Sequence, residues 1–139
     1  MRLITDTNRI IAALIKDGAS RKVILSNKFE LVTAEFTRKE LREHRVEILK
    51  KAKISEKDLD GLLALFFKRI YVVDDSALKV KFETAMKITD KIDPDDTPFI
   101  ALALYIDNDG IWSDDRHFKM QKVISVFTTS NLLKILSEG

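Results

Sequence analysis

The chain of 139 residues carries a formal net charge of +2 at pH 7, so no overall basic bias points to nucleic acid. Its content of hydrophobic residues, 45%, and of charged residues, 33%, is that of a globular protein, and we expect one domain over residues 1–139. The absence of cysteine excludes disulfides, thiolate metal ligands and cysteine nucleophiles. No apolar run has the length of a signal-peptide core or a membrane span, so we expect a cytoplasmic protein without membrane contact.

The hydrophobic pattern of the first half alternates between short β-branched runs and helical spacing. A strand is predicted over residues 3–5, followed by a helix that stops at Gly18. Ser20 is expected to cap a second, short helix. A second strand is predicted over residues 29–33, and a long charged helix over residues 37–53.

The second half continues the alternation of strands and helices. Ser55, three residues before Asp58, is expected to cap the next helix. The elements expected after it are a strand over 70–73, a helix over 76–92, an acidic loop, a helix over 98–106, strands over 111–113 and 124–128, and a helix over 130–136. Strands separated by helices favour βαβ units, so we predict a three-layer α/β/α sandwich with a mostly parallel central sheet.

Acidic residues follow predicted strands or begin predicted helices at four separate places. These residues are Asp6 after the first strand, Glu40 in the first turn of the charged helix, Asp95 and Asp96 before the helix over 98–106, and Asp114 and Asp115 after the strand over 111–113. In open α/β sheets the ligand site lies outside the carboxyl ends of the strands. These positions therefore allow acids far apart in sequence to converge on one site.

Converging carboxylates favour a bound cation. Two bare carboxylates about 4 Å apart repel by roughly 4 kcal/mol at an effective dielectric constant of about 20. Such clusters persist when a divalent metal neutralises them or when some members stay protonated. An oxygen-rich, histidine-poor set suits Mg²⁺ or Mn²⁺ rather than Zn²⁺, and the matching chemistry is hydrolytic phosphoryl transfer by metal-activated water.

Local structure offers other roles for several of these residues. Thr37 and Glu40 have the spacing of a capping box, an interpretation as reasonable as a metal role for Glu40. Asp6 has an alternative as the N-cap of the first helix. Thr97, which Pro98 follows, is the expected N-cap of the helix after the acidic loop.

The segment around the last acidic pair contains further candidates. One of Asp114 and Asp115 is expected to be a plain turn residue. Trp112 is expected in the core. His44 and His117 are the two histidines of the chain, and each is expected at the surface rather than at a metal.

Four segments, taken together, resemble the motifs of the PIN-domain family. LITDTNRII is similar to the family's opening strand, with Asp6 as the first metal-binding acid and Asn8 beside it. LVTAEFTRKELREH resembles the second motif, in which Thr33 ends the strand and Glu40 provides the acid. DPDDTPFIALAL is similar to the third motif, which places metal binding on Asp96.

The fourth segment, IWSDDRHF, resembles the last motif of the family. Its small polar residue and its acid correspond to Ser113 and Asp115. Asp114 stands where many members have glycine, so the roles of the two aspartates are interchangeable at this point. His117 stands where many members have a further aspartate, so a fifth acid is not expected.

The resemblance implies a ribonuclease that depends on Mg²⁺ or Mn²⁺ and cleaves single-stranded RNA. Under it, Asp6, Asp96 and Asp115 (or Asp114) hold the metal, and Glu40 binds metal or acts as a general base. The residues that would orient water or carboxylates behind this set are Asn8, Thr33 and Ser113, and those that would contact the RNA backbone are Arg9, Arg116 and Lys119.

The resemblance also implies partners. Many small members are VapC-like toxins of toxin–antitoxin pairs and many are homodimers, so an antitoxin and a second copy of the chain are expected partners beside RNA. The alternatives are a non-catalytic protein of this fold that binds RNA or a partner, and a metal-dependent phosphatase or phospho-acceptor. The phosphatase alternative is weaker because Asp6 lacks the acidic neighbour that such sites need.

Overall fold

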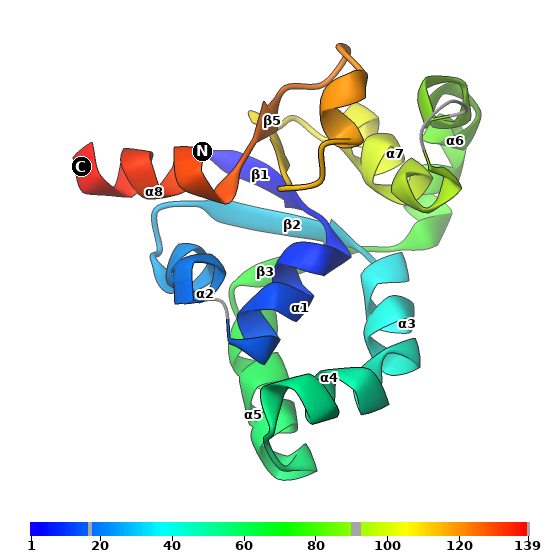
Figure 1. Cartoon of the computed structure of the whole chain (residues 1–139). Coiled ribbons are helices and arrows are strands. Elements are labelled where there is room, and N and C mark those ends of the chain that lie inside the picture. Colours follow the sequence, from blue (N-terminus) through cyan, green and yellow to red (C-terminus); the bar gives the residue numbers. More distant parts are fainter. Residues whose placement is uncertain (17, 90–92, 139) are drawn as a thin grey trace.

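A computed structural model describes residues 1–16, 18–89 and 93–138 of the chain. Its centre is a sheet of five strands, β1 (Arg2–Thr5), β2 (Glu30–Ala34), β3 (Ile70–Val73), β4 (Gly110–Trp112) and β5 (Val126–Phe127). The strand order is β3-β2-β1-β4-β5, and all four pairings are parallel. The predicted parallel sheet is confirmed (Figure 1).

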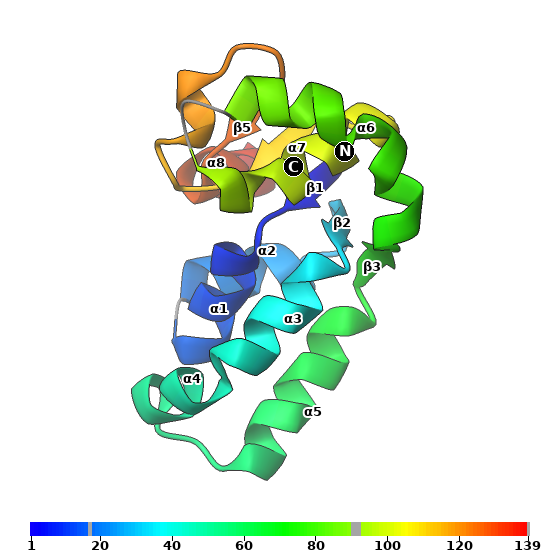
Figure 2. The ribbon, with the colours of Figure 1, turned by 90° about the vertical axis from the view of Figure 1, so that its right-hand side faces the viewer.

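Helices cover both faces of the sheet. They are α1 (Thr7–Ile15), α2 (Gly18–Leu25), α3 (Phe36–Glu43), α4 (Arg45–Ala52), α5 (Glu56–Phe67), α6 (Asp75–Thr89), α7 (Thr97–Tyr105) and α8 (Thr129–Glu138), with short 3-10 turns η1 (Pro94–Asp96) and η2 (Phe118–Met120). Figure 2 shows α6 and α7 above the sheet and α1, α3, α4 and α5 below it, which confirms the three-layer arrangement. No helix within the described ranges is long and apolar enough to cross a membrane.

The core has two parts because successive strand residues point to opposite faces of the sheet. Leu3 of β1 packs with α1, α2 and α5, whereas its neighbour Ile4 packs with α6 and α7. In β4, Trp112 joins the first part and Ile111 the second. Trp112 is completely buried, so its predicted place in the core is confirmed.

The long charged helix predicted over residues 37–53 is wrong, because the structure divides it in two. His44 has φ −97° and ψ 8°, which ends α3 at Glu43 and lets α4 begin at Arg45. The break turns α4 against α1, where Ile48 is buried with an exposed fraction of 2%. Neither glycine nor proline marks this bend, so the tertiary packing against α1 decides it.

Two predicted helix caps have different outcomes. Ser55 caps α5, and its Oγ accepts a hydrogen bond from the Asp58 amide at 3.1 Å, as predicted. Ser20 is not a cap, because α2 already begins at Gly18. The predicted end of the helix over 76–92 lies outside the described residues, and the structure begins this helix at Asp75.

The direction in which the chain builds the sheet changes beside β1. From β1 the chain adds β2 and then β3 on one side, and then crosses over to place β4 and β5 on the other side. A crevice at the carboxyl ends of the strands on either side of such a switch is the usual ligand site of open α/β sheets. Here the residues at that place are Asp6, which follows β1, and Ser113, which follows β4.

Candidate metal centre

Asp6 is a buried carboxylate that links two segments. Its Oδ1 accepts a hydrogen bond from the Arg9 amide at 3.0 Å, which confirms the predicted N-cap role. Its Oδ2 accepts a hydrogen bond from Ser113 Oγ at 2.6 Å. Burial raises the pKa of Asp6 to about 6 although both hydrogen bonds and the Arg9 charge oppose the rise.

Ser113 joins Asp6 to the acid that follows β4. The Ser113 side chain is fully buried, and its Oγ accepts a hydrogen bond from the Asp115 amide at 3.0 Å. The Asp115 carboxylate in turn accepts a hydrogen bond from the His117 amide at 2.9 Å. A connected path of hydrogen bonds therefore runs from the end of β1 through the turn after β4.

Asp96 is the most unusual acid of the site. Its exposed fraction is 8%, and its Oδ2 is buried without a hydrogen-bond partner. Its pKa is raised to about 7, mainly by burial and then by the negative charges of Asp93, Asp115, Asp6 and Asp95. All of these influences disfavour the ionised form, and no protein cation is among them.

The predicted cap of α7 is wrong in one detail. Thr97 lies inside the helix, and its hydroxyl forms a hydrogen bond of 2.7 Å with the Thr89 hydroxyl of α6. The residue at the N-cap position is Asp96, which makes no side-chain capping bond. Its carboxylate is therefore held at the start of α7 without being used to cap that helix.

Glu40 does not form the predicted capping box. α3 begins at Phe36, so Thr37 lies within the helix and cannot cap it. Glu40 Oε1 instead accepts a hydrogen bond from Thr7 Oγ1 at 2.5 Å. The pKa of Glu40 is raised, first by burial and also by the charge of Asp95, while the bond from Thr7 opposes the rise.

Threonine hydroxyls support Glu40 from behind. The Thr37 hydroxyl lies 3.0 Å from that of Thr7 and 2.8 Å from that of Thr33. Thr33 donates to the Thr5 carbonyl at 2.7 Å, so its contact with Glu40 runs through two other threonines. The sequence reasoning chose Thr33 but missed Thr7 and Thr37, although Thr37 lies one helical turn before Glu40.

Asn8 has a different position from the one expected. Its side chain is exposed and makes no hydrogen bond with any described residue. The residue before it, Thr7, is buried and contacts Glu40 directly. Thr7, the first residue of α1, therefore supports the site, whereas Asn8, the second residue, does not.

The contacts of Asp114 are with Thr129 and Arg9 rather than with the other acids. Its Oδ1 accepts a hydrogen bond from the Thr129 amide at 2.7 Å, and its Oδ2 accepts one from the Thr129 hydroxyl at 2.6 Å. Arg9 Nη1 lies 2.5 Å from the same Oδ2 and 3.1 Å from Ser20 Oγ. These contacts tie Asp114 to the first residue of α8, as expected for a turn residue, and pair the Arg9 guanidinium with Asp114.

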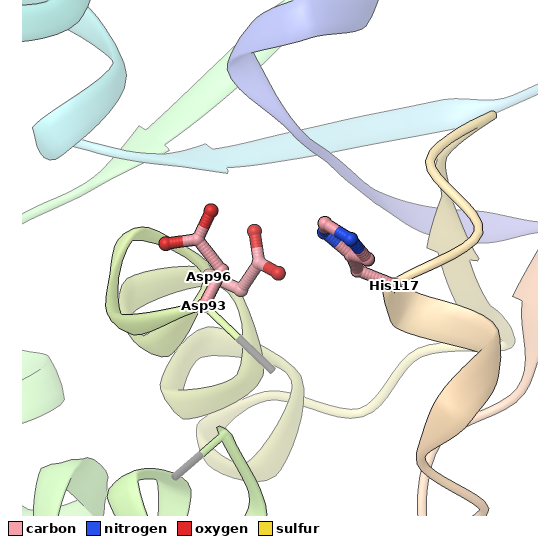
Figure 3. Close-up of side chains that lie close together, drawn as sticks. All are labelled: Asp93, Asp96 and His117. Carbon is pink, nitrogen blue, oxygen red and sulfur yellow. The ribbon is translucent and has the colours of Figure 1, made fainter. Parts of the chain in front are cut away.

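Among the described residues, Asp93, Asp96 and His117 form a compact group of potential metal ligands (Figure 3). One ligand atom from each of the three lies within 4.8 Å of the others. Asp6, Glu40 and Asp115 are not part of this group. The sequence marked Asp93 as an acid beyond what helix capping requires but gave it no metal role, and it placed His117 at the surface. The His117 side chain is indeed exposed, but it lies beside the two aspartates.

The fold and these acids define a parallel α/β protein with an acidic centre where the sheet switches direction. A family model described as PIN domain matches residues 4–135. The chain belongs to the PIN-domain family.

A comparison with solved structures identifies a chain of similar fold. It is found in the crystal structure of VapBC2 from Rickettsia felis bound to a DNA fragment from their promoter. The TM-score is 0.67 and the sequence identity 15%, and the match covers 92% of this chain and 98% of that chain. A comparison with curated protein sequences gives no match.

Proposed function

We propose that the chain is a ribonuclease that hydrolyses single-stranded RNA with Mg²⁺ or Mn²⁺ as its cofactor. The observation that carries the proposal is Asp96, whose buried Oδ2 has no partner and whose neighbouring charges are negative. A carboxylate in this setting is stable when it is protonated or when a cation lies beside it. The donor atoms fit a hard divalent ion, and membership in the PIN-domain family supports hydrolysis of phosphodiester bonds.

The carboxylates have separate roles in this proposal. Asp6, Asp96 and Asp115 would hold the ion, and Glu40 would bind it or accept a proton as a general base. When bound, the ion lowers the pKa of a water molecule and neutralises charge on the phosphate. Ser113 keeps Asp6 and Asp115 in fixed relation through its two hydrogen bonds. Asp114 is left out because Thr129 and Arg9 occupy its oxygens.

Contacts with RNA would come from the segment after β4. Arg116 and Lys119 are exposed and follow Asp115 closely in sequence, so they are suited to bind phosphate groups. Arg9 is not included because its guanidinium pairs with Asp114. The negative centre repels RNA in the absence of metal, so we expect RNA affinity to depend on the divalent ion as well as on salt.

We further propose that the chain acts in the cytoplasm as the toxin of a toxin–antitoxin pair and forms a homodimer. The similarity of fold to a chain of the VapBC2 structure supports this role. A gene for a small DNA-binding protein beside the gene for this chain is the expected genetic context. The product of that neighbouring gene should bind the chain and inhibit RNA cleavage, as measured by co-purification and a cleavage assay.

The catalytic proposal is tested by the variant Asp96→Asn. We expect cleavage of single-stranded RNA by the wild type in Mn²⁺, its loss in EDTA, and a decrease of about 100-fold or more in the variant, since a metal ligand is removed. Asp58→Asn is the matched control, because it makes the same change at an exposed position in α5.

Two results would contradict the proposal. One is cleavage by the wild type that persists in EDTA, and the other is full activity of Asp96→Asn. Calorimetry with Mn²⁺ distinguishes the proposed nuclease from the non-catalytic alternative. A protein that binds no Mn²⁺ at millimolar concentration has no metal centre, and this result would favour the alternative. The phospho-acceptor alternative would instead show a phosphorylated aspartate after treatment with a phosphoryl donor.

A further inference from the structure

Asp93, Asp96 and His117 come together from two distant segments. Asp93 precedes η1 and Asp96 ends it, whereas His117 lies in the segment between β4 and η2. Figure 3 shows the two carboxylates side by side and the imidazole ring of His117 facing them. One ligand atom of each residue lies within 4.8 Å of the others.

This spacing fits a single ion. Ligand atoms bound at about 2.1 Å are about 3 Å apart when adjacent on an octahedral ion and about 4.2 Å apart when opposite. Ligand atoms at most 4.8 Å apart can therefore bind one ion after side-chain movements of about 1 Å or less.

The orientation of Asp93 is already determined by the local backbone. Asp93 is the N-cap of η1, and its Oδ1 accepts a hydrogen bond from the Asp95 amide at 3.0 Å. This bond occupies one carboxylate oxygen and leaves the other available. The aspartate is therefore prepared to bind a cation without losing its structural contact.

Asp96 provides an independent indication that a ligand belongs here. Its Oδ2 is buried and has no hydrogen-bond partner, and its side chain extends into the same group. Buried polar atoms almost always have a partner, so an unpartnered carboxylate oxygen is a candidate position for a bound cation. Capping does not explain this oxygen, because Asp96 makes no capping bond to α7.

His117 is held in position by Asp115. The His117 amide donates to Asp115 Oδ1 at 2.9 Å, and its ring Nδ1 lies 3.4 Å from the same oxygen. A carboxylate beside the imidazole is the usual companion of a metal-binding histidine, because it fixes the orientation of the ring. Asp115 would therefore position His117 in addition to holding the ion directly.

We propose that Asp93, Asp96 and His117 bind one divalent ion together, and that the nitrogen of His117 makes this position prefer Mn²⁺ over Mg²⁺. Both ions favour oxygen ligands, but Mn²⁺, a transition-metal ion, accepts an imidazole nitrogen more readily than Mg²⁺ does. The inference rests on the proposed metal-dependent function and adds a nitrogen ligand and a selectivity to it.

Pulsed electron paramagnetic resonance of the full chain with Mn²⁺ alone as the probe tests this ligand set. We expect strong ¹⁴N modulation from a directly bound imidazole in the wild type and its loss in His117→Asn. His44→Asn is the matched control, because His44 is the other histidine of the chain and is exposed; it should keep the signal. Asp93→Asn should weaken Mn²⁺ binding and keep the nitrogen signal.

Calorimetry provides the second readout. We expect His117→Asn to bind Mn²⁺ about 10-fold more weakly while Mg²⁺ affinity changes little, so the preference for Mn²⁺ disappears. Bound Mn²⁺ without imidazole modulation in the wild type, or with unchanged modulation in His117→Asn, would overturn the inference and leave metal-dependent cleavage standing. Absence of any Mn²⁺ binding at millimolar concentration would overturn the inference together with the proposed function.

Discussion

The carboxyl group of Asp96 connects the pH of the solution to the stability of the metal-free protein. Burial and the charge of Asp93 raise its pKa to about 7, and burial raises the pKa of Asp6 to about 6, whereas the ordinary value of both is 3.8. Between about pH 4 and pH 7 the folded protein therefore binds more protons than the unfolded chain. The stabilisation that the two protonated carboxyl groups provide is therefore complete below about pH 4 and is lost as the pH rises through about 7.

This linkage predicts the behaviour of Asp96→Asn without metal. Because asparagine stays neutral, we expect the free energy of unfolding of the variant to change less between pH 5 and 8 than that of the wild type. At pH 8 the variant should be more stable by about 1–2 kcal/mol. Urea unfolding in EDTA at several pH values measures this, with Asp58→Asn expected to follow the wild type. Parallel pH profiles for Asp96→Asn and the wild type would refute the assigned pKa shift.

At the scale of elements, the contact between β4 and β5 depends on one glycine. Gly110 has φ +151°, a backbone conformation that other residues rarely adopt. A Cβ atom there would lie 2.8 Å from the Ser125 carbonyl oxygen and equally close to the Phe127 ring. Since the same strand leads to Ser113 and Asp115, this close pairing also positions the acidic turn.

We therefore predict that Gly110→Ala lowers the free energy of unfolding by about 2–4 kcal/mol, because both the backbone strain and the steric overlap oppose the new methyl group. Gly61→Ala is the control, since its Cβ would lie in open space on α5. That change should raise stability by about 0.5–1 kcal/mol, as expected for alanine in a helix. Denaturant unfolding distinguishes the two, and equal effects would show that the glycine at 110 is not required.

The helix that carries Asp96 behaves as its sequence predicts. Seven of the nine residues of α7 are buried, from Thr97 to Ala103. The helix packs against α6 and against the central strands β1 and β2. Such burial on all sides makes α7 a rigid support, so the position of Asp96 is set by the core rather than by a surface loop.

At the scale of the whole molecule, the proposed ion would connect segments that the chain places far apart. Asp6 follows the central strand, Asp96 directly precedes α7, and Asp115 and His117 follow β4. The ion binds this arrangement only when the strands and helices are assembled, so binding should stabilise the folded state by mass action.

We predict that Mn²⁺ at about 100 times its dissociation constant adds about 2.7 kcal/mol to the stability of the wild type. For a chain of this size the increase corresponds to a rise of about 9 °C in the melting temperature. EDTA should reverse the rise, and Asp96→Asn should show little of it. A scanning calorimetry trace in which the variant gains as much as the wild type would place the ion elsewhere.

Two pairs of residues with the same sequence spacing form different hydrogen bonds. Ser55 and Asp58 are three residues apart, and their predicted capping bond is present. Thr37 and Glu40 have the same spacing but form no such bond, because α3 already begins at Phe36 and Thr7, far away in sequence, donates a hydrogen bond to Glu40. Local spacing therefore predicts a contact only where no tertiary partner competes.

The sequence by itself determined the alternation of strands and helices, the parallel sheet and the placing of acids at strand ends, because hydrophobic periodicity and turn residues act over a few positions. Only the tertiary structure decided that Asp114 pairs with Arg9, that the chain bends at His44, and that His117 stands beside Asp93 and Asp96. These outcomes depend on how segments about 20 to 100 residues apart pack and on which rotamers that packing allows, which no local pattern specifies.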